Sequence, residues 1–276
     1  MANSPLPIVG GHKSGFGATT RTDSWWVGPA LTFLGLSFFV VYATWAAFQG
    51  EHYYHAPYLS PFYSPVVYSD LAAAGAAPLE HTLLGAWPAW WPAFIPASPA
   101  FLILMFPGAF RFTCYYYRKA YYRSFTGTPP SCAVGPAKVG NYKGETTFLL
   151  FQNLHRYALY FALIFVVILY YDAFCALFKN GEFGFGVGTL VLFINATLLA
   201  GYTFGCHSFR HLVGGRDNEK SCAGGPSTKM SLWRRASWCN ERHMNFAWLS
   251  LFWVGFSDFY VRMVSMGIIP DWNTWA

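Results

Sequence analysis

Long runs of apolar residues dominate this chain and alternate with shorter polar segments. A membrane-spanning helix needs about 20 predominantly apolar residues, and five stretches reach that length. The pattern therefore predicts an all-α integral membrane protein with five transmembrane helices in one bundle. We expect a polar N-terminal tail over residues 1–24 and a transmembrane domain over residues 25–276. The five predicted spans are Trp25–Gln49, Trp90–Tyr117, Thr146–Phe178, Phe185–Leu212 and Trp238–Met266.

Composition and charge support this class. Of the 276 residues, 54% are hydrophobic and only 11% are charged, which excludes an ordinary soluble domain. Lysine and arginine are enriched in the 118–145 and 213–237 connections and absent from the 51–89 connection. Cytoplasmic loops carry the excess of basic residues, so we expect a cell-membrane protein with a cytoplasmic N-terminus. The net charge of +6 then follows from topology, and nucleic acid is not an expected partner.

Two parts of the chain resemble each other. The motif F-x-C-x-x-(Y/F)-R occurs over residues 112–118 and again over 204–210. Each copy is followed by a Ser-Cys-Ala loop, at 131–136 and 221–226, and then by a histidine early in the next helix. Three matches in one order predict that helices 2–3 and 4–5 form a parallel internal repeat, with an axis along the membrane normal.

A twofold repeat brings equivalent residues together. Two cysteines facing two histidines form the ligand set of a Rieske-type 2Fe–2S centre, and also of tetrahedral zinc; the spacing leaves both open. The loop cysteines are favoured, because the small residues beside them allow close approach of the backbone, whereas a helical cysteine is more often a packing residue. The candidate ligands are the pairs Cys132 and Cys222, Cys114 and Cys206, and His155 and His243.

Other polar residues lie near the predicted centre without matching the repeat. His207 and His211 are four residues apart and share a helix face, but Tyr115 and Lys119 occupy the equivalent positions. We therefore expect the two histidines to contact a quinone or deliver protons. Arg156 and Arg242 adjoin the candidate histidine ligands and could bind a quinone oxygen, offset cluster charge or hold haem propionates; for Arg242, reaching lipid phosphate is the alternative.

These features resemble the membrane anchor subunit of succinate dehydrogenase or fumarate reductase, in its actinobacterial, mycobacterial type. The resemblance is carried by the repeated SCAVGP and SCAGGP loops and by Cys114, Cys206, His155 and His243. It implies a membrane-embedded Rieske-type 2Fe–2S cluster in a subunit of succinate:quinone oxidoreductase, respiratory complex II. Succinate would be oxidised in a flavoprotein subunit of this tricarboxylic acid cycle enzyme. Electrons would pass through a docked iron–sulfur subunit to menaquinone or ubiquinone. Whether the complex forms a higher oligomer is left open.

Two other readings stay open at this stage. A haem b quinone-reactive cytochrome of another respiratory complex would bind one haem through His155 and His243, or through His207 or His211. Two haems are disfavoured because the outer half offers only His52 and His55, both at the edge of a span. A non-redox transporter would fit parallel repeats, but the grouping of histidine and cysteine at one membrane face argues against it. The chain also lacks the C-T-H-L-G-C type of loop that soluble Rieske domains use.

Overall fold

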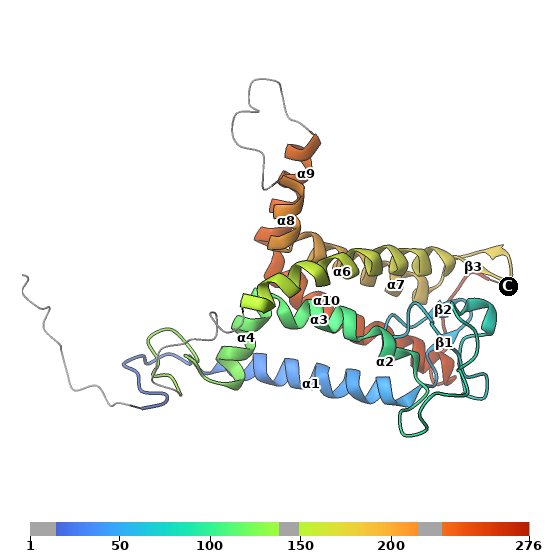
Figure 1. Cartoon of the computed structure of the whole chain (residues 1–276), viewed down its shortest axis with the longest axis horizontal. Helices are drawn as coiled ribbons and strands as arrows, with labels where there is room; N and C mark the ends of the chain where they lie inside the picture. The colour runs from blue at the N-terminus through green and yellow to red at the C-terminus, as the bar shows by residue number, and fades with distance from the viewer. Residues whose placement is uncertain (1–14, 138–148, 215–227, 276) are drawn as a thin grey trace, which may run out of the picture. The chain divides into compact units, whose positions relative to one another are not determined.

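The computed structural model describes residues 15–137, 149–214 and 228–275. The chain forms two compact units, one of Met1–Phe38 with Tyr115–Leu149 and one of Phe39–Cys114 with Leu150–Ala276. We refer to them as unit 1 and unit 2. The helices shown in Figure 1 are α1 (Val27–Gln49), α2 (Pro99–Ile103), α3 (Met105–Thr113), α4 (Tyr115–Phe125), α6 (Leu149–Cys175), α7 (Val187–Phe204), α8 (His207–Gly214), α9 (Thr228–Glu241) and α10 (His243–Ser265), with a short 3-10 turn at Leu79–His81.

Among the residues that the structure describes, three helices are long and apolar enough to cross a membrane. They cover Val27–Gln49, Leu154–Cys175 and Val187–Phe204, inside the first, third and fourth predicted spans. The 23 residues of α1 rise about 34 Å at 1.5 Å per residue, which exceeds the hydrocarbon thickness of a bilayer. Gly50 ends this helix with a φ of 64°, a conformation that glycine adopts without strain. The prediction of a mostly helical chain with membrane-spanning helices is therefore confirmed.

Three of the predicted spans are not continuous helices, which corrects the sequence-based boundaries. The second is divided among α2, α3 and α4, the fourth between α7 and α8, and the fifth between α9 and α10 at Arg242. Cys114 separates α3 from α4 with φ −61° and ψ 129°. Gly205 and Cys206 separate α7 from α8, and a Cβ atom at Gly205 would lie 2.8 Å from the Cys239 carbonyl oxygen. The cysteine of each F-x-C motif thus lies at a helix break.

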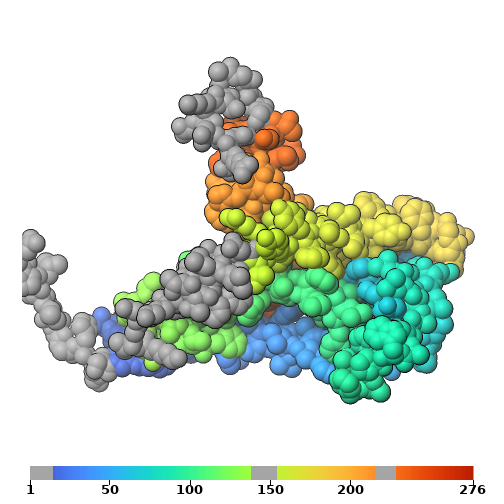
Figure 2. Space-filling view, viewed as in Figure 1, coloured from blue at the N-terminus to red at the C-terminus, as the bar shows by residue number. Residues whose placement is uncertain are grey.

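Short strands add a small β component to the fold. A hairpin of β1 (Tyr54–His55) and β2 (Tyr58–Leu59) follows α1, and a hairpin of β3 (Phe178–Lys179) and β4 (Glu182–Phe183) joins α6 to α7. The second hairpin turns at Asn180 and Gly181, which both have positive φ angles, as a tight Asn-Gly hairpin turn requires. In Figure 2, the connection that follows α1 gathers at one end of unit 2, beside this second hairpin.

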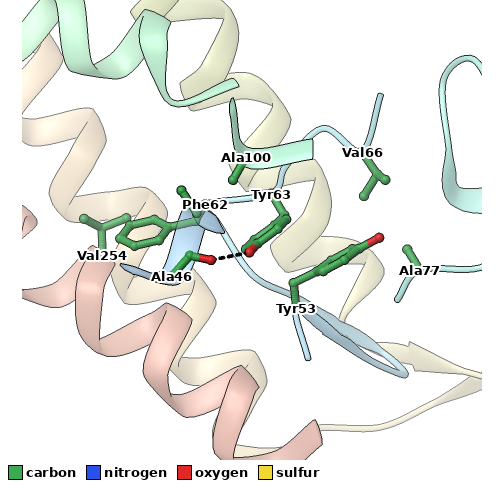
Figure 3. Packing of buried hydrophobic residues seen from close by; sticks show 9 residues of the cluster. Ala46, Tyr53, Phe62, Tyr63, Val66, Ala77, Ala100 and Val254 are labelled. Atoms are coloured by element: carbon green, nitrogen blue, oxygen red, sulfur yellow. Dashed lines mark hydrogen bonds between the residues drawn. The ribbon is translucent and has the colours of Figure 1, made fainter. Parts of the chain in front are cut away.

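Aromatic side chains from that connection fill the core of unit 2 (Figure 3). Tyr53 and Tyr63 stack with ring centroids 4.3 Å apart. The Tyr63 hydroxyl donates a hydrogen bond of 2.6 Å to the carbonyl oxygen of Ala46. Phe62 packs in the same buried cluster, with Val254 of α10. The cluster therefore fixes the connection to α1 and α10 without leaving a buried hydroxyl unpaired.

A buried ion pair lies on α10 next to this core. Asp258 and Arg262 are 0% and 1% exposed, with 3.6 Å between Oδ2 and Nε. The carboxylate also accepts hydrogen bonds from the hydroxyls of Tyr42, at 2.7 Å, and Ser60, at 2.5 Å. Arg262 donates to the Glu51 carbonyl oxygen at 2.8 Å. One charged pair thus connects α10 to α1 and to the connection that follows it.

Unit 1 is fastened by residues that precede α1. The Thr19 hydroxyl donates to the Ala133 carbonyl oxygen at 2.7 Å. The Arg21 guanidinium donates to Ser131 Oγ and to the Cys132 carbonyl oxygen, each at 2.9 Å. It also binds both carboxylate oxygens of Asp23, and this hydrogen bonding lowers the pKa of that carboxyl. The segment before α1 therefore holds the loop that carries Cys132.

Removing the acidic partner of the buried pair should destabilise the protein strongly. Asp258→Ala leaves the Arg262 charge buried without its carboxylate, and we expect a loss of about 3–5 kcal/mol in the free energy of unfolding. Denaturant titration in detergent micelles measures the change. Glu182→Ala, which removes an exposed carboxylate, is the matched control and should change it by less than about 0.5 kcal/mol. Equal losses for the two variants would contradict the structural role of the pair.

Candidate metal centre

Two cysteines and two histidines meet inside unit 2. His155 Nε2 lies 2.9 Å from Cys206 Sγ, and His243 Nε2 lies 3.6 Å from Cys114 Sγ. Cys114 and Cys206 are 3% and 2% exposed, and His155 is 7% exposed. These four residues, the Cys/His quartet, come from the end of α3, from α6, from the α7–α8 break and from the start of α10. The chain thus forms two separate Cys–His contacts in apolar surroundings.

Aromatic rings flank the quartet in a matching way on both sides. Phe110 stacks on His155 with centroids 4.7 Å apart, and Tyr202 stacks on His243 at 4.9 Å. The two aromatic rings meet each other edge to face at 5.4 Å. Each ring precedes a quartet cysteine by four residues, one helical turn. Within each F-x-C segment, the aromatic ring therefore contacts one histidine and the cysteine contacts the other, and these two histidines belong to different helices.

A hydroxyl group fixes the orientation of His155. Thr113 Oγ1 lies 2.7 Å from the Ala109 carbonyl oxygen, to which it donates, and 2.9 Å from His155 Nδ1. Since a hydroxyl carries one proton, its oxygen accepts the second hydrogen bond, and Nδ1 carries the imidazole proton. The lone pair is then on Nε2, the atom that faces Cys206. Metal-ligating histidines are held in this way by a second hydrogen bond.

The quartet differs from a site for one metal ion. Within residues 15–137, 149–214 and 228–275, no three His, Cys, Asp or Glu side chains are grouped closely enough to hold a single ion. The close contacts instead form two separate Cys–His pairs. A 2Fe–2S cluster contains two irons with two protein ligands on each, and in the Rieske type two imidazoles bind one iron and two thiolates bind the other. The quartet matches this set in number and kind.

The other predicted ligands and quinone contacts lie elsewhere. Cys132 belongs to unit 1 and is exposed, and Cys222 lies outside the described residues. The loop pair, which the sequence favours, therefore stays a prediction, whereas the helical pair is the one that the structure brings to the histidines.

The four residues predicted to contact a quinone are accessible on unit 2. His207 and His211 form a pair with their Nε2 atoms 3.0 Å apart, and both are exposed, as is Arg156. Arg242 stacks on Trp238, 4.3 Å from the ring centroid. The contact of all four residues with a quinone stays a prediction.

Sequence reasoning missed the residues that surround the quartet. Phe110 and Tyr202 occupy equivalent positions of the two F-x-C segments, so an aromatic residue four positions before each cysteine was a usable signal. Thr113 carried no such signal, because Gly205 is its equivalent. Arg111 also approaches the site: its guanidinium lies 4.7 Å from the Tyr202 ring centroid and donates to Ser250 Oγ at 2.9 Å.

Comparisons with known proteins agree with this architecture. Residues 27–267 match the family described as actinobacterial succinate dehydrogenase subunit SdhC. The fold is similar to a chain of the Mycobacterium smegmatis Sdh1 complex in the apo form, with a TM-score of 0.81 and 44% sequence identity over 94% of each chain. No curated protein sequence matches the chain.

The fold and these matches define a helical membrane subunit of a respiratory enzyme. The chain belongs to the actinobacterial succinate dehydrogenase subunit SdhC family. It is a membrane anchor subunit of succinate dehydrogenase and hence part of an enzyme complex that oxidises succinate and reduces a quinone.

Proposed function

We propose that this anchor holds a Rieske-type 2Fe–2S centre through Cys114, Cys206, His155 and His243. The observation that carries the proposal is the approach of both histidine Nε2 atoms to buried cysteine sulfurs. The quartet offers two thiolates and two imidazoles, the complete protein ligand set of such a centre. When bound, the cluster would exchange single electrons at a potential higher than all-cysteine ligation gives.

The chain's own residues have separate tasks in this proposal. Thr113 holds His155 with Nε2 directed at the ligand position. Phe110 and Tyr202 pack against the imidazoles and exclude water from them.

The proposal includes a topology and two partner subunits. The α2–α3 segment and α10 complete five spans with α1, α6 and α7, and the N-terminus is cytoplasmic because the basic connections lie on that side. A flavoprotein subunit oxidises succinate, and an iron–sulfur subunit docks on the cytoplasmic connections. The paired contacts Cys206–His155 and Cys114–His243 support the parallel repeat. Menaquinone is the proposed acceptor, and His207, His211, Arg156 and Arg242 are its proposed cytoplasmic-side contacts.

A haem b centre is the alternative that uses the same histidines. A bis-histidine haem would need His155 and His243 to face each other across the macrocycle. Each imidazole nitrogen instead faces a sulfur, which favours the cluster. Optical spectra of the reduced complex separate the two, because only haem gives a sharp alpha band.

Replacing the quartet cysteines should abolish the centre. We expect Cys114→Ser and Cys206→Ser each to remove the anchor's iron and acid-labile sulfide, measured against the iron–sulfur subunit's own content. The low-average-g EPR signal of a Rieske-type centre should disappear with them. Cys132→Ser and Cys222→Ser are the matched controls. If the loop variants lose the iron and the helical ones keep it, the ligand assignment is wrong.

Thr113 should affect the centre without being a ligand. Thr113→Val removes the hydrogen bond to His155 Nδ1 at nearly constant volume, and loss of such a partner lowers metal affinity about 10–100-fold. Competition with an iron chelator, followed by the EPR signal, measures the change. Thr113→Ser keeps the hydroxyl and should behave as the unmodified protein. Chelator resistance unchanged by Thr113→Val would contradict this positioning role.

The proposed topology can be checked with two exposed thiols. Cys132 follows α4, and Cys175 ends α6; both are exposed. A membrane-impermeant maleimide should label Cys175 in intact spheroplasts and Cys132 only in inverted vesicles stripped of the soluble subunits. Cys132→Ser and Cys175→Ser identify the labelled peptides. Labelling of both thiols from the same side would contradict the five-span arrangement.

A further inference from the structure

Unit 1 contains a cavity of about 570 Å³ beside the start of α1. Its described walls come from the residues just before α1, from the first turns of that helix, and from the end of α4 with the loop that follows it. The volume falls within the range of small-molecule sites. Most of the lining side chains are apolar, and Arg123 is the one charged residue among the described residues that line it. The cavity therefore combines a large apolar surface with a single cation.

Contacts within unit 1 hold these walls in place. The rings of Phe33 on α1 and Phe125 at the end of α4 pack with centroids 4.7 Å apart. Phe16 closes over Gly127, where a Cβ atom would lie 2.7 Å from Phe16 Cε2. Two main-chain hydrogen bonds, of 3.0 and 2.8 Å, join residues 17–18 to Gly135 in the loop after α4. The cavity is thus bounded by elements that pack against one another.

The cavity lies at the level where a membrane-spanning helix leaves the hydrocarbon. The first candidate span begins at Val27, and the two residues directly before it, Trp25 and Trp26, line the cavity. Tryptophan is enriched at the boundary between the hydrocarbon and the polar headgroups of a bilayer. The cavity is therefore within reach of phospholipid headgroups.

An exposed apolar stripe continues from the cavity along α1. Trp26, Ala30, Leu34 and Phe38 follow at intervals of four residues, so each neighbours the next on the helix surface, and the first three line the cavity. Trp26, Leu34 and Phe38 are 58%, 61% and 67% exposed. The stripe rises about 18 Å at 1.5 Å per residue, close to half of the roughly 30 Å hydrocarbon thickness. An acyl chain on this stripe would run from the headgroup level to the bilayer centre.

Arg123 supplies positive charge that the described protein does not neutralise. It is half-buried, and no hydrogen bond or ion pair joins it to another residue that the structure describes. In the described part of unit 1, Arg21, Arg118, Lys119 and Arg123 are accompanied by a single carboxylate, Asp23, which binds Arg21. A guanidinium can donate two parallel hydrogen bonds to phosphate oxygens. The charge at this wall is therefore complementary to a phosphate group.

We infer that this cavity binds an anionic phospholipid, with its phosphate at Arg123 and an acyl chain on the Trp26–Phe38 stripe of α1. Basic pockets beside membrane-spanning helices bind the headgroups of such lipids. A zwitterionic phospholipid carries the same chains, but its amine cancels the phosphate charge. The inference concerns unit 1 alone and does not depend on the proposed metal centre.

The test uses the purified complex in detergent and a phosphatidylglycerol that carries a diazirine on one acyl chain. Photolabelled peptides are identified by mass spectrometry, and we expect them to come from α1. Unlabelled phosphatidylglycerol should displace the probe. Phosphatidylcholine with the same chains and inorganic phosphate should not displace it at matched concentrations.

Variants separate the charge from the shape of the cavity. In Arg123→Gln, the Kd for phosphatidylglycerol should rise about fivefold, the factor for about 1 kcal/mol from one basic residue beside anionic lipid. Arg123→Lys keeps the charge and should retain most of the affinity. Lys119→Gln is the matched control, because it removes an exposed charge from the same helix but does not line the cavity. Ala30→Leu fills the cavity and should lower labelling at unchanged charge.

Size-exclusion chromatography checks the assembly of each variant, and Ala30→Leu tests the same cavity if Arg123→Gln does not assemble. Displacement by phosphatidylcholine as effective as by phosphatidylglycerol would overturn the inference, because the chains alone would then account for binding. Equal losses in Arg123→Gln and Lys119→Gln would overturn it as well. Displacement by inorganic phosphate would indicate an anion site that takes no lipid, and labels confined to unit 2 or to the other subunits would place the lipid elsewhere.

Discussion

The pairing of polar groups inside unit 2 is the constraint on which its structure depends. In the hydrocarbon of a bilayer no water can satisfy a buried charge or a backbone group. Asp258 meets this demand with Arg262 and two hydroxyls. These contacts join α10 to α1 and to the connection after it. Because α10 also carries His243 at its first position, the pair that fixes α10 also fixes one half of the candidate centre.

The two helix breaks determine how the cysteines of the same candidate centre are oriented. An unbroken helix would direct Cys114 and Cys206 according to the 3.6-residue period of the flanking turns. Extended backbone at Cys114 and the Gly205–Cys206 junction release both residues from that period. Gly205 also permits close approach of the Cys239 backbone, and Asn240 donates to the Gly205 carbonyl oxygen at 2.7 Å. The break after α7 is thus held in place by the residues just before α10.

Hydropathy could locate the apolar segments of this chain but not its breaks. The residues around Cys114 are as aromatic as their neighbours, so no pattern marks the end of α3, whereas Gly205 is a helix-stop signal at the end of α7. The repeat predicted that equivalent residues would meet, and both candidate cysteine pairs followed from it; the close contacts instead join Cys206 to His155 and Cys114 to His243. The preference for the loop pair rested on local backbone freedom alone. Which cysteines reach His155 and His243 depends on how α6 and α10 pack against α3 and α7, and that is not a local property.

Some polar groups near the candidate centre occur in only one half of the proposed repeat. Cysteine, histidine and the flanking ring occur in both halves, and these are the groups that contact the proposed cluster. Arg111 and Thr113 occur in the first half only. The equivalent positions of the second half hold Thr203 and Gly205. A symmetric ligand set needs only the shared groups, whereas an acceptor bound on one side of it requires a local charge and a shape that the other side lacks. Arg111 and its equivalent Thr203 both line the same apolar cavity of unit 2, so the cavity does not belong to one half. The asymmetry of the sequence therefore places the fixed positive charge and the hydroxyl that orients His155 in the first half of the proposed repeat.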